Sequence, residues 1–594
     1  MTASHRRAVQ WSLPAYALLL ALLVVAPLLR PGYLLLRDAV STPRSYLSDT
    51  ALGLTAPPRA TPQDFAVALA SHLIDGGIVV KALLVLGLWL AGFGTARLVA
   101  TALPDAGVAG QFVATTLAIW NPYVAERLLQ GHWSLLVGYG ALPWVATAML
   151  RLRFGAPGFF ALVFWIALAG LTPTGSMLAA TVALVSVAAP GDGRPRLFCA
   201  ATASGAALVA AVPWLTAAAT GSSLAVPKAA SRLGVYAFAP RAEPGLGTLG
   251  SLASLGGIWN SEAVPASRAT LFAVVSAVVL LAVVAAGLPT AARRPAVLPL
   301  LVLAVAAVVI PAALATGSGL RALAAVVDAA PGLGVLRDGQ KWVALAMPGY
   351  ALAGAGAVLT LRRWLHPAAT ALVGCMALIA VLPDAGWGVG GKVTAVSYPP
   401  GWAAVTAEIN RAPAPVAVLP AGSMRRFAWS GPAPVLDPLP RWLRADVLST
   451  GDLAISGTVV PGEGARARAI QELLLSGPPS SALAPAGVGW LVVESDSAGD
   501  MGRAGRTLST LTPVFRDKEL TLYRIGGRGG AVPSARRVVT MIAHLAWLGL
   551  LIGGAAGAML GAAWRRRGQR GRWAAAGPRH LNHGDDTPTD VAED

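Results

Sequence analysis

The sequence predicts a polytopic α-helical membrane protein of about twelve transmembrane helices, because apolar runs near the ~20 residues that span a bilayer recur along it. Composition supports this class: of 594 residues, 55% are hydrophobic and 12% are charged, whereas a soluble domain has about 25% charged residues. A more polar stretch of about 150 residues, an ordinary domain size, precedes the last run. It predicts an α/β domain outside the membrane.

The apolar runs predict the spans in chain order. They lie near 11–30, 77–98, 107–125, 134–150, 157–172, 174–190, 197–219, 270–288, 297–315, 342–361, 368–384 and 537–563. The first run is too long for a signal-peptide core and no small-residue cleavage site follows it, so we interpret it as a permanent span. Cys199 and Cys375 fall inside apolar runs and indicate packing residues rather than a redox compartment.

Arginines at alternate ends of the runs predict the orientation, since short cytoplasmic loops are enriched in basic residues. Pairs such as Arg6 and Arg7, or Arg151 and Arg153, mark the cytoplasmic side. Both termini are therefore predicted inside. The long connections 31–76, 220–269, 316–341 and 385–535 are predicted outside. The arginines do not form one basic face, so the net charge of +18 does not indicate a nucleic-acid partner.

The predicted division of the chain has four parts. Residues 1–384 form a transmembrane module of eleven spans, 385–535 an extracytoplasmic α/β domain, 536–564 the final helix and 565–594 a disordered cytoplasmic tail. Within the α/β domain, β-type runs occur at 416–419, 488–493 and 520–525, with a helical pattern at 465–475. Arg425, Trp429 and Trp442 lie in its predicted loops, where a cation beside aromatic rings suits weak binding of a sugar acceptor.

Asp38 is the candidate general base. It follows the first run at the start of a long outside loop, with Asp49 further along the same loop as a reserve. The interiors of the spans hold almost no acidic residues, which argues against ion-coupled transport. The sequence also lacks a nucleotide-binding or HExxH motif in a suitable context.

Basic residues at an outside membrane end run against the usual charge bias and predict a site for a lipid phosphate. Arg337 and Lys341 directly precede the tenth run, and Arg127 and His132 join the third and fourth. Acidic neighbours in the same segments, Glu126 and Asp338, are predicted to support them. The alternative is that these long side chains simply reach the membrane interface.

These parts suit sugar transfer from a polyprenyl phosphate. Asp38 would take the proton of the acceptor hydroxyl as it attacks the anomeric carbon. Arg337 and Lys341, helped by Arg127 and His132, would stabilise the departing lipid phosphate.

Short motifs at these residues resemble the GT-C superfamily of integral membrane glycosyltransferases, in particular the actinobacterial cell-wall arabinofuranosyl- and mannosyltransferases. The matches are Arg37-Asp38, Asn121-Pro122 with Gly131-His132-Trp133, and Leu336-Arg337-Asp338 with Lys341-Trp342. The resemblance implies a plasma-membrane enzyme with an extracytoplasmic active face, and a first-loop acid, here Asp38, as the base. It implies a polyprenyl-phosphate sugar as donor and an envelope glycan or glycolipid as acceptor. Many members pair two acids in this loop, whereas Ala39 follows Asp38 here, so a divalent metal stays an open possibility.

Two other functions stay open. The chain could be a non-catalytic envelope protein that binds or translocates glycolipids through the same outside surfaces. A lipid flippase or secondary transporter is less consistent with spans that lack acidic residues.

Overall fold

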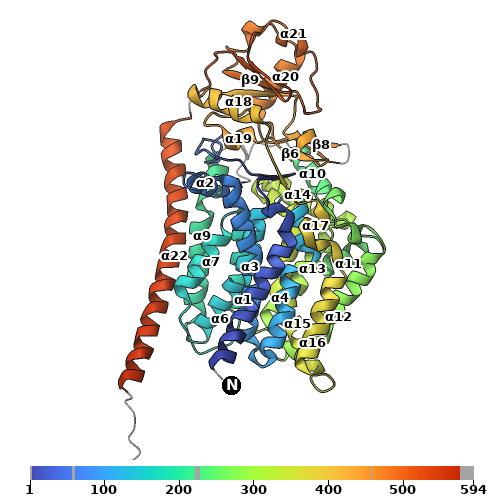
Figure 1. Ribbon diagram of the computed structural model, residues 1–594, viewed down its shortest axis with the longest axis vertical. Helices are drawn as coiled ribbons and strands as arrows, with labels where there is room; N and C mark the ends of the chain where they lie inside the picture. Colours follow the sequence, from blue (N-terminus) through green and yellow to red (C-terminus); the bar gives the residue numbers. More distant parts are fainter. Residues whose placement is uncertain (1–2, 56–59, 221–227, 456–457, 531, 576–594) are drawn as a thin grey trace, which may run out of the picture.

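The computed structural model describes residues 3–55, 60–220, 228–455, 458–530 and 532–575. Each predicted apolar run contains a helix of the upright bundle in Figure 1. These helices are α1 (Ala3–Val25), α3 (Gly76–Ala102), α4 (Gly107–Ile119), α6 (Trp133–Arg153), α7 (Phe159–Ala169), α8 (Pro173–Ser186), α9 (Arg196–Thr220), α12 (Phe272–Ala292), α13 (Leu298–Leu314), α15 (Met347–Leu361), α16 (Pro367–Ala380) and α22 (Ser534–Ala575).

The multi-pass helical class is confirmed, whereas the number of spans stays a prediction. Among the described residues, seven helical segments are long and apolar enough to cross a membrane, or up to nine if each bent pair is one span. α7 and α8 are shorter apolar helices. The third predicted run, 107–125, is not one helix, because Asn121 and Pro122 end α4 and start the buried helix α5 (Pro122–Leu129).

Close backbone approach holds the centre of the bundle together. A Cβ atom on Gly140 of α6 would lie 2.1 Å from the carbonyl oxygen of Gly87 on α3. Small residues permit such contacts, and packing of this kind drives association of helices in a membrane. α6 is almost wholly buried, whereas α22 runs along one side of the bundle, against α7 and α9 (Figure 1).

An α/β region stands at one end of the bundle (Figure 1). Its four-stranded sheet has the order β10-β11-β9-β4, in which β4 is parallel to β9 and the other neighbours are antiparallel. Alternate residues of β9 face two cores: Val492 packs with α18, and Leu491 packs with α20. The three predicted strands and the predicted helix are therefore present. The bounds are β4 (Val416–Leu419), β9 (Trp490–Glu494), β10 (Pro513–Arg516), β11 (Leu520–Arg524), α18 (Pro400–Arg411), α19 (Leu439–Trp442), α20 (Ala465–Ser476) and α21 (Gly505–Leu508).

A second small sheet joins the first long loop to the α/β region. β1 (Tyr33–Leu36) lies between β2 (Ala39–Val40) and β3 (Ala395–Val396). Helices of other long connections, such as α2 (Gln63–Ala70), α10 (Lys228–Ala237) and α14 (Gly317–Ala329), lie near the same end of the bundle (Figure 1). The remaining short elements are α11 (Gly247–Ala253), α17 (Gly386–Gly391), the hairpin β5 (Met424–Arg425) with β6 (Val435–Leu436), and the hairpin β7 (Leu453–Ile455) with β8 (Thr458–Val460).

The predicted disordered tail, 565–594, is corrected in its first part. α22 continues through the arginines that follow the apolar run and ends at Ala575. Arginine, glutamine and alanine in this segment favour a helix, and the two glycines, Gly568 and Gly571, do not interrupt it. Residues 576–594 lie outside the described residues.

Candidate functional site

Asp38 occupies the tight turn between β1 and β2. The register pairs Leu36 with Ala39, so Arg37 and Asp38 form a two-residue turn, and Arg37 has a φ of +49°. Gly131 packs directly against this turn with a φ of +85°, and a Cβ atom there would lie 2.4 Å from Ala39 N and Leu36 O. No larger residue fits at position 131 without displacing the turn.

Arg37 anchors the turn on three sides. Its Nη1 donates to Leu129 O at 2.6 Å, and its Nη2 donates to Glu262 O at 2.9 Å. Its backbone N–H donates to Pro434 O, and its carbonyl oxygen accepts from Leu436 N, so the α/β region also holds it. The sequence motif Arg37-Asp38 therefore combines a residue that fixes the turn with one that presents a carboxylate.

A chain of hydrogen bonds connects Asp38 to the helix bundle. Asp38 Oδ2 lies 2.9 Å from His132 Nε2 and accepts from Gln130 Nε2 at 3.1 Å. His132 Nδ1 lies 3.1 Å from Arg127 Nη1. A guanidinium only donates, so Nδ1 must accept, and Nε2 carries the proton that is donated to Asp38. The neutral histidine thus has its tautomer fixed by Arg127.

Arg127 is fixed in turn by a carboxylate. Its Nη1 donates to Asp338 Oδ2 at 2.8 Å, its Nη2 donates to Asp338 Oδ1 at 3.0 Å, and Gln340 Oε1 accepts a further bond. The Arg127 side chain is completely buried. Its prediction as a ligand of the donor phosphate is therefore wrong: internal partners occupy the guanidinium, and its role is to position His132.

His132 is corrected in the same way, since both ring nitrogens face protein groups. The supporting role predicted for Asp338 agrees with its contact to Arg127. Glu126 supports the network from beneath. It accepts from Gln340 Nε2 at 3.0 Å and from the backbone N–H groups of Gly257 and Ile258 at 3.3 and 3.1 Å.

The environment keeps Asp38 ionised and His132 neutral near pH 7. Burial acts to raise the pKa of Asp38, but hydrogen bonds from His132 and Gln130 and the charge of Lys341 outweigh it and hold the pKa below its usual value. Burial lowers the pKa of His132, helped by the positive charges of Lys341 and Arg127. A protonated His132 would also turn an N–H toward the Arg127 guanidinium. Asp38 therefore keeps its negative charge without an imidazolium beside it.

The chain of hydrogen bonds ends at a partly exposed side chain, that of Asp38. The Asp38 side chain is 33% exposed, against 16% for His132 and 25% for Lys341. Lys341 Nζ lies 3.7 Å from Asp338 Oδ2, and its charge acts on Asp38. Nearby, the Arg337 guanidinium stacks on the ring of Phe238 at 4.5 Å from its centroid. The structure thus places the Asp38 carboxylate and the Lys341 ammonium close together at a partly exposed position, and the charge of Arg337 acts on Lys341.

Sequence reasoning missed several partners of this network. Gln130 and Gln340 lie next to predicted residues, and this adjacency was the only signal for them. It also missed the buried ion pair of Arg268 with Glu243. Burial and the nearby Glu243 carboxylate raise the pKa of Glu126 well above its usual value. The charge of Arg268, which pairs with Glu243, offsets this rise in the pKa of Glu126 only in part.

Other predicted site residues lie apart from Asp38. Asp49 pairs with Arg537 at the start of α22. Arg425 is buried between Glu494 and Asp437, so it has no free face for an acceptor. Trp429 and Trp442 pack on Tyr398 in an aromatic core, with ring centroids 5.3 and 4.7 Å away. We therefore leave Arg425, Trp429 and Trp442 out of the site, which corrects their prediction as acceptor-binding residues.

Metal ligands do not gather in the described part of the chain, where no group of three or more His, Cys, Asp and Glu side chains could hold an ion. The charges of Lys341 and Arg37 interact with that of Asp38, so both neighbours are cations rather than metal-binding carboxylates.

Comparison with solved structures identifies the fold. No family model matches the sequence, and no curated protein does so either. A cryo-EM structure of the arabinofuranosyltransferase AftD from Mycobacteria matches 88% of this chain at 17% sequence identity, with a TM-score of 0.54. A mutant of AftD matches 88% at the same identity, with a TM-score of 0.53. The chain has the fold of part of AftD.

The match to AftD confirms, at the level of the fold, the resemblance to membrane glycosyltransferases. The chain spans 40% of the length of the AftD chain that it matches.

Proposed function

We propose that this protein is a membrane glycosyltransferase, which moves a sugar from a polyprenyl-phosphate donor to a cell-envelope glycan or glycolipid. The observation that carries the proposal is the partly exposed, ionised carboxylate of Asp38 at the end of a buried hydrogen-bond chain, with the charge of Lys341 acting on it. The fold shared with AftD supports the same reaction class.

The geometry divides the two oxygens of Asp38 between two tasks. Within the described residues, His132 and Gln130 both contact Oδ2. Oδ1 is therefore the atom proposed to take the proton from the acceptor hydroxyl. As that hydroxyl oxygen bonds to the anomeric carbon, the bond from this carbon to the phosphate oxygen breaks. Asp38 later releases the proton to water.

The cations act on the leaving group. The departing lipid phosphate gains negative charge as the bond to the sugar breaks, and its stabilisation is assigned to Lys341, whose charge acts on Asp38, and to Arg337, whose charge acts on Lys341. General-base and electrostatic contributions are each commonly worth about 10²–10⁴ in rate. His132 and Arg127 contribute by orientation, because both ring nitrogens of His132 and both Nη groups of Arg127 already contact protein groups.

The proposed location is the outer face of the plasma membrane. The Asp38 turn is hydrogen-bonded to the α/β region, which stands at one end of the bundle, while the N-terminus lies at the other (Figure 1). The bias of the short basic connections assigns the N-terminal end to the cytoplasm.

The test is a transfer assay with the full chain in lipid nanodiscs. Radiolabelled polyprenyl-phosphate arabinofuranose, and the mannose equivalent, are supplied with an envelope glycan fraction, and labelled product is separated from donor. We expect product with one of the two donors and a loss with Asp38→Asn. Full transfer by Asp38→Asn would remove Asp38 from the mechanism. Tight donor binding without product in the unmodified chain would favour a non-catalytic glycolipid-binding protein.

A further inference from the structure

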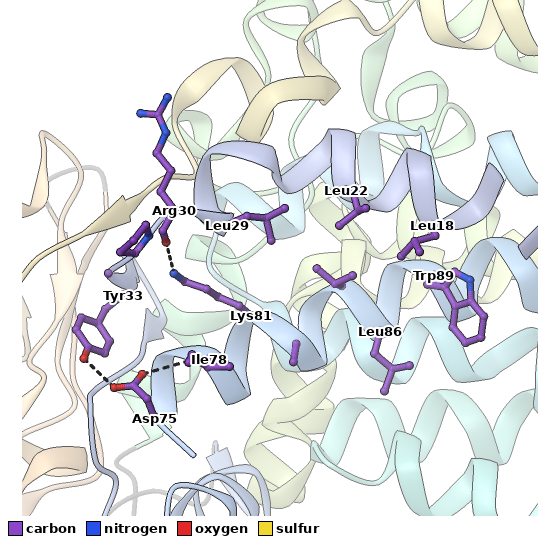
Figure 2. A pocket seen from close by; sticks show the side chains of 14 residues that line it. Leu18, Leu22, Leu29, Arg30, Tyr33, Asp75, Ile78, Lys81, Leu86 and Trp89 are labelled. Atoms are coloured by element: carbon purple, nitrogen blue, oxygen red, sulfur yellow. Dashed lines mark hydrogen bonds between the residues drawn. The ribbon is translucent and has the colours of Figure 1, made fainter. Parts of the chain in front are cut away.

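A groove between α1 and α3 opens on the side of the bundle (Figure 2). It encloses about 880 Å³, within the ~300–1,000 Å³ usual for ligand sites. Its walls are apolar and run along both helices, with Leu18, Leu22, Leu86 and Trp89 among the side chains that line them. Several of these side chains face outward: Leu18 is 41% exposed and Leu86 is 37% exposed.

One end of the groove is polar. Lys81, in the second turn of the membrane helix α3, enters it from one wall, and Arg30 lies at the rim with its side chain directed away from Lys81 (Figure 2). Lys81 Nζ donates to Arg30 O at 2.6 Å. An ammonium has three donors, so this bond leaves two for a ligand. A lysine at a membrane helix end calls for a partner or for access to the interface.

Asp75, the acidic residue of the groove, is already engaged. Its Oδ1 accepts from Gly77 N at 2.8 Å and caps α3, and its Oδ2 accepts from the Tyr33 hydroxyl at 2.9 Å. Arg30, Lys81 and Asp75 together leave one net positive charge at the polar end. A ligand that complements this end carries one negative charge above an apolar chain.

We propose that this groove binds an anionic glycerophospholipid of the surrounding bilayer. Its phosphate would lie on Lys81, within reach of the charge of Arg30, and an acyl chain would lie along the leucines of α1 and α3. A phosphodiester carries a single negative charge, which matches the net charge of the polar end. A phosphomonoester carries about −1.5 to −2 at pH 7.

The occupant is not the reacting lipid of the proposed transfer. The residues that line the groove do not include Asp38, His132, Arg337 or Lys341. Tyr33 links the two places, since it lines the groove and begins the strand that leads to the Asp38 turn. The groove is therefore a separate lipid site, and it stands whether or not the chain transfers sugar.

Native mass spectrometry of the full purified chain tests the site. The delipidated protein is titrated with phosphatidylglycerol or with phosphatidylcholine, and the retained lipid is counted. We expect preferential retention of phosphatidylglycerol, with Lys81→Met reducing its affinity about tenfold or more, because a hydrogen bond to a charged group is lost. Lys81→Arg should retain most of the affinity.

Matched variants separate the groove from the general surface. Arg97→Met removes an exposed cation from the other end of the same helix and should leave retention unchanged. Leu86→Trp should reduce retention by filling the apolar wall, with circular dichroism confirming the fold. Equal loss in Lys81→Met and Arg97→Met, or equal retention of the two lipids, would overturn the proposal. Displacement of phosphatidylglycerol by an equal concentration of polyprenyl phosphate would also overturn it, because the groove would then be a site for the carrier lipid.

Discussion

Two buried arginines use the same local chemistry in different parts of the molecule. Arg127 in the helix bundle pairs with Asp338, and Arg425 in the α/β region pairs with Glu494 and Asp437. Both guanidinium groups are at least 98% buried. The difference lies in what each arginine touches next. Arg127 contacts His132, which in turn contacts the Asp38 carboxylate, whose side chain is 33% exposed. The carboxylate partners of Arg425 are 8% exposed or less.

The comparison shows that a buried ion pair alone does not indicate a functional site. Around Arg425, burial raises the pKa of Glu494 to about 8, with the nearby Asp437 carboxylate adding to the effect. One of these two carboxylates therefore holds a proton, and the cluster is closed. The Arg127 network instead ends in an ionised group that reaches solvent, and only such an end can exchange a proton with a substrate.

Neutralising one carboxylate in each cluster tests whether the two clusters differ in function. Asp38→Asn should lower transfer by about 10²–10⁴, the usual contribution of a positioned base. Glu494→Gln should leave the rate per folded molecule unchanged, because its carboxyl is closed off from substrate. Product formation is measured per molecule of monodisperse protein. A similar loss in both variants would mean that the two clusters do not differ in function.

Removal of each arginine is expected to have the same effect on stability. Arg127→Met and Arg425→Met each leave a buried carboxylate without its partner, which costs about 3–5 kcal/mol. Thermal unfolding in detergent measures this effect. Only Arg127→Met should also abolish transfer in the fraction that remains folded, since it frees the His132 ring. Retained transfer would show that Arg127 does not position His132.

Substitution of His132 should move the pH profile. His132→Phe removes a donor to the Asp38 carboxylate, so the depressed pKa of Asp38 should rise toward its usual value. Asp38 is active when ionised, so the acidic limb of the rate profile should move to higher pH. His132→Gln keeps an N–H donor and should restore part of the shift. An unchanged limb would exclude this role for His132.

The smallest effect is expected at Asp49, the reserve base. Asp49 pairs with Arg537, whose side chain is 50% exposed, and exposed ion pairs contribute about 0–1 kcal/mol. Asp49→Asn should therefore change transfer and thermal stability only slightly. A loss of transfer as large as that of Asp38→Asn would reassign the base to Asp49.

The sequence predicts more of the fold than of the hydrogen-bond partners within the site. Membrane length and hydropathy suffice to locate the apolar helices of the bundle, and the segments that carry Asp38, Glu126, Asp338 and Lys341 do meet at one place. The role of Arg127 could not be predicted, because its partner Asp338 is 211 residues away. Arg425 was misassigned for the same reason, since Glu494 lies 69 residues further along. Charge type is local, whereas hydrogen-bond partners are set by packing.

The hydrogen bonds between the Asp38 turn and the α/β region have a consequence for the order of assembly. The turn is synthesised long before the α/β region, yet Arg37 is hydrogen-bonded to Pro434 and Leu436, and β1 pairs with β3. Chains fold largely from the N-terminus as they emerge. The Asp38 turn therefore reaches its final position only after the α/β region has been synthesised. A product truncated before that region lacks the complete site.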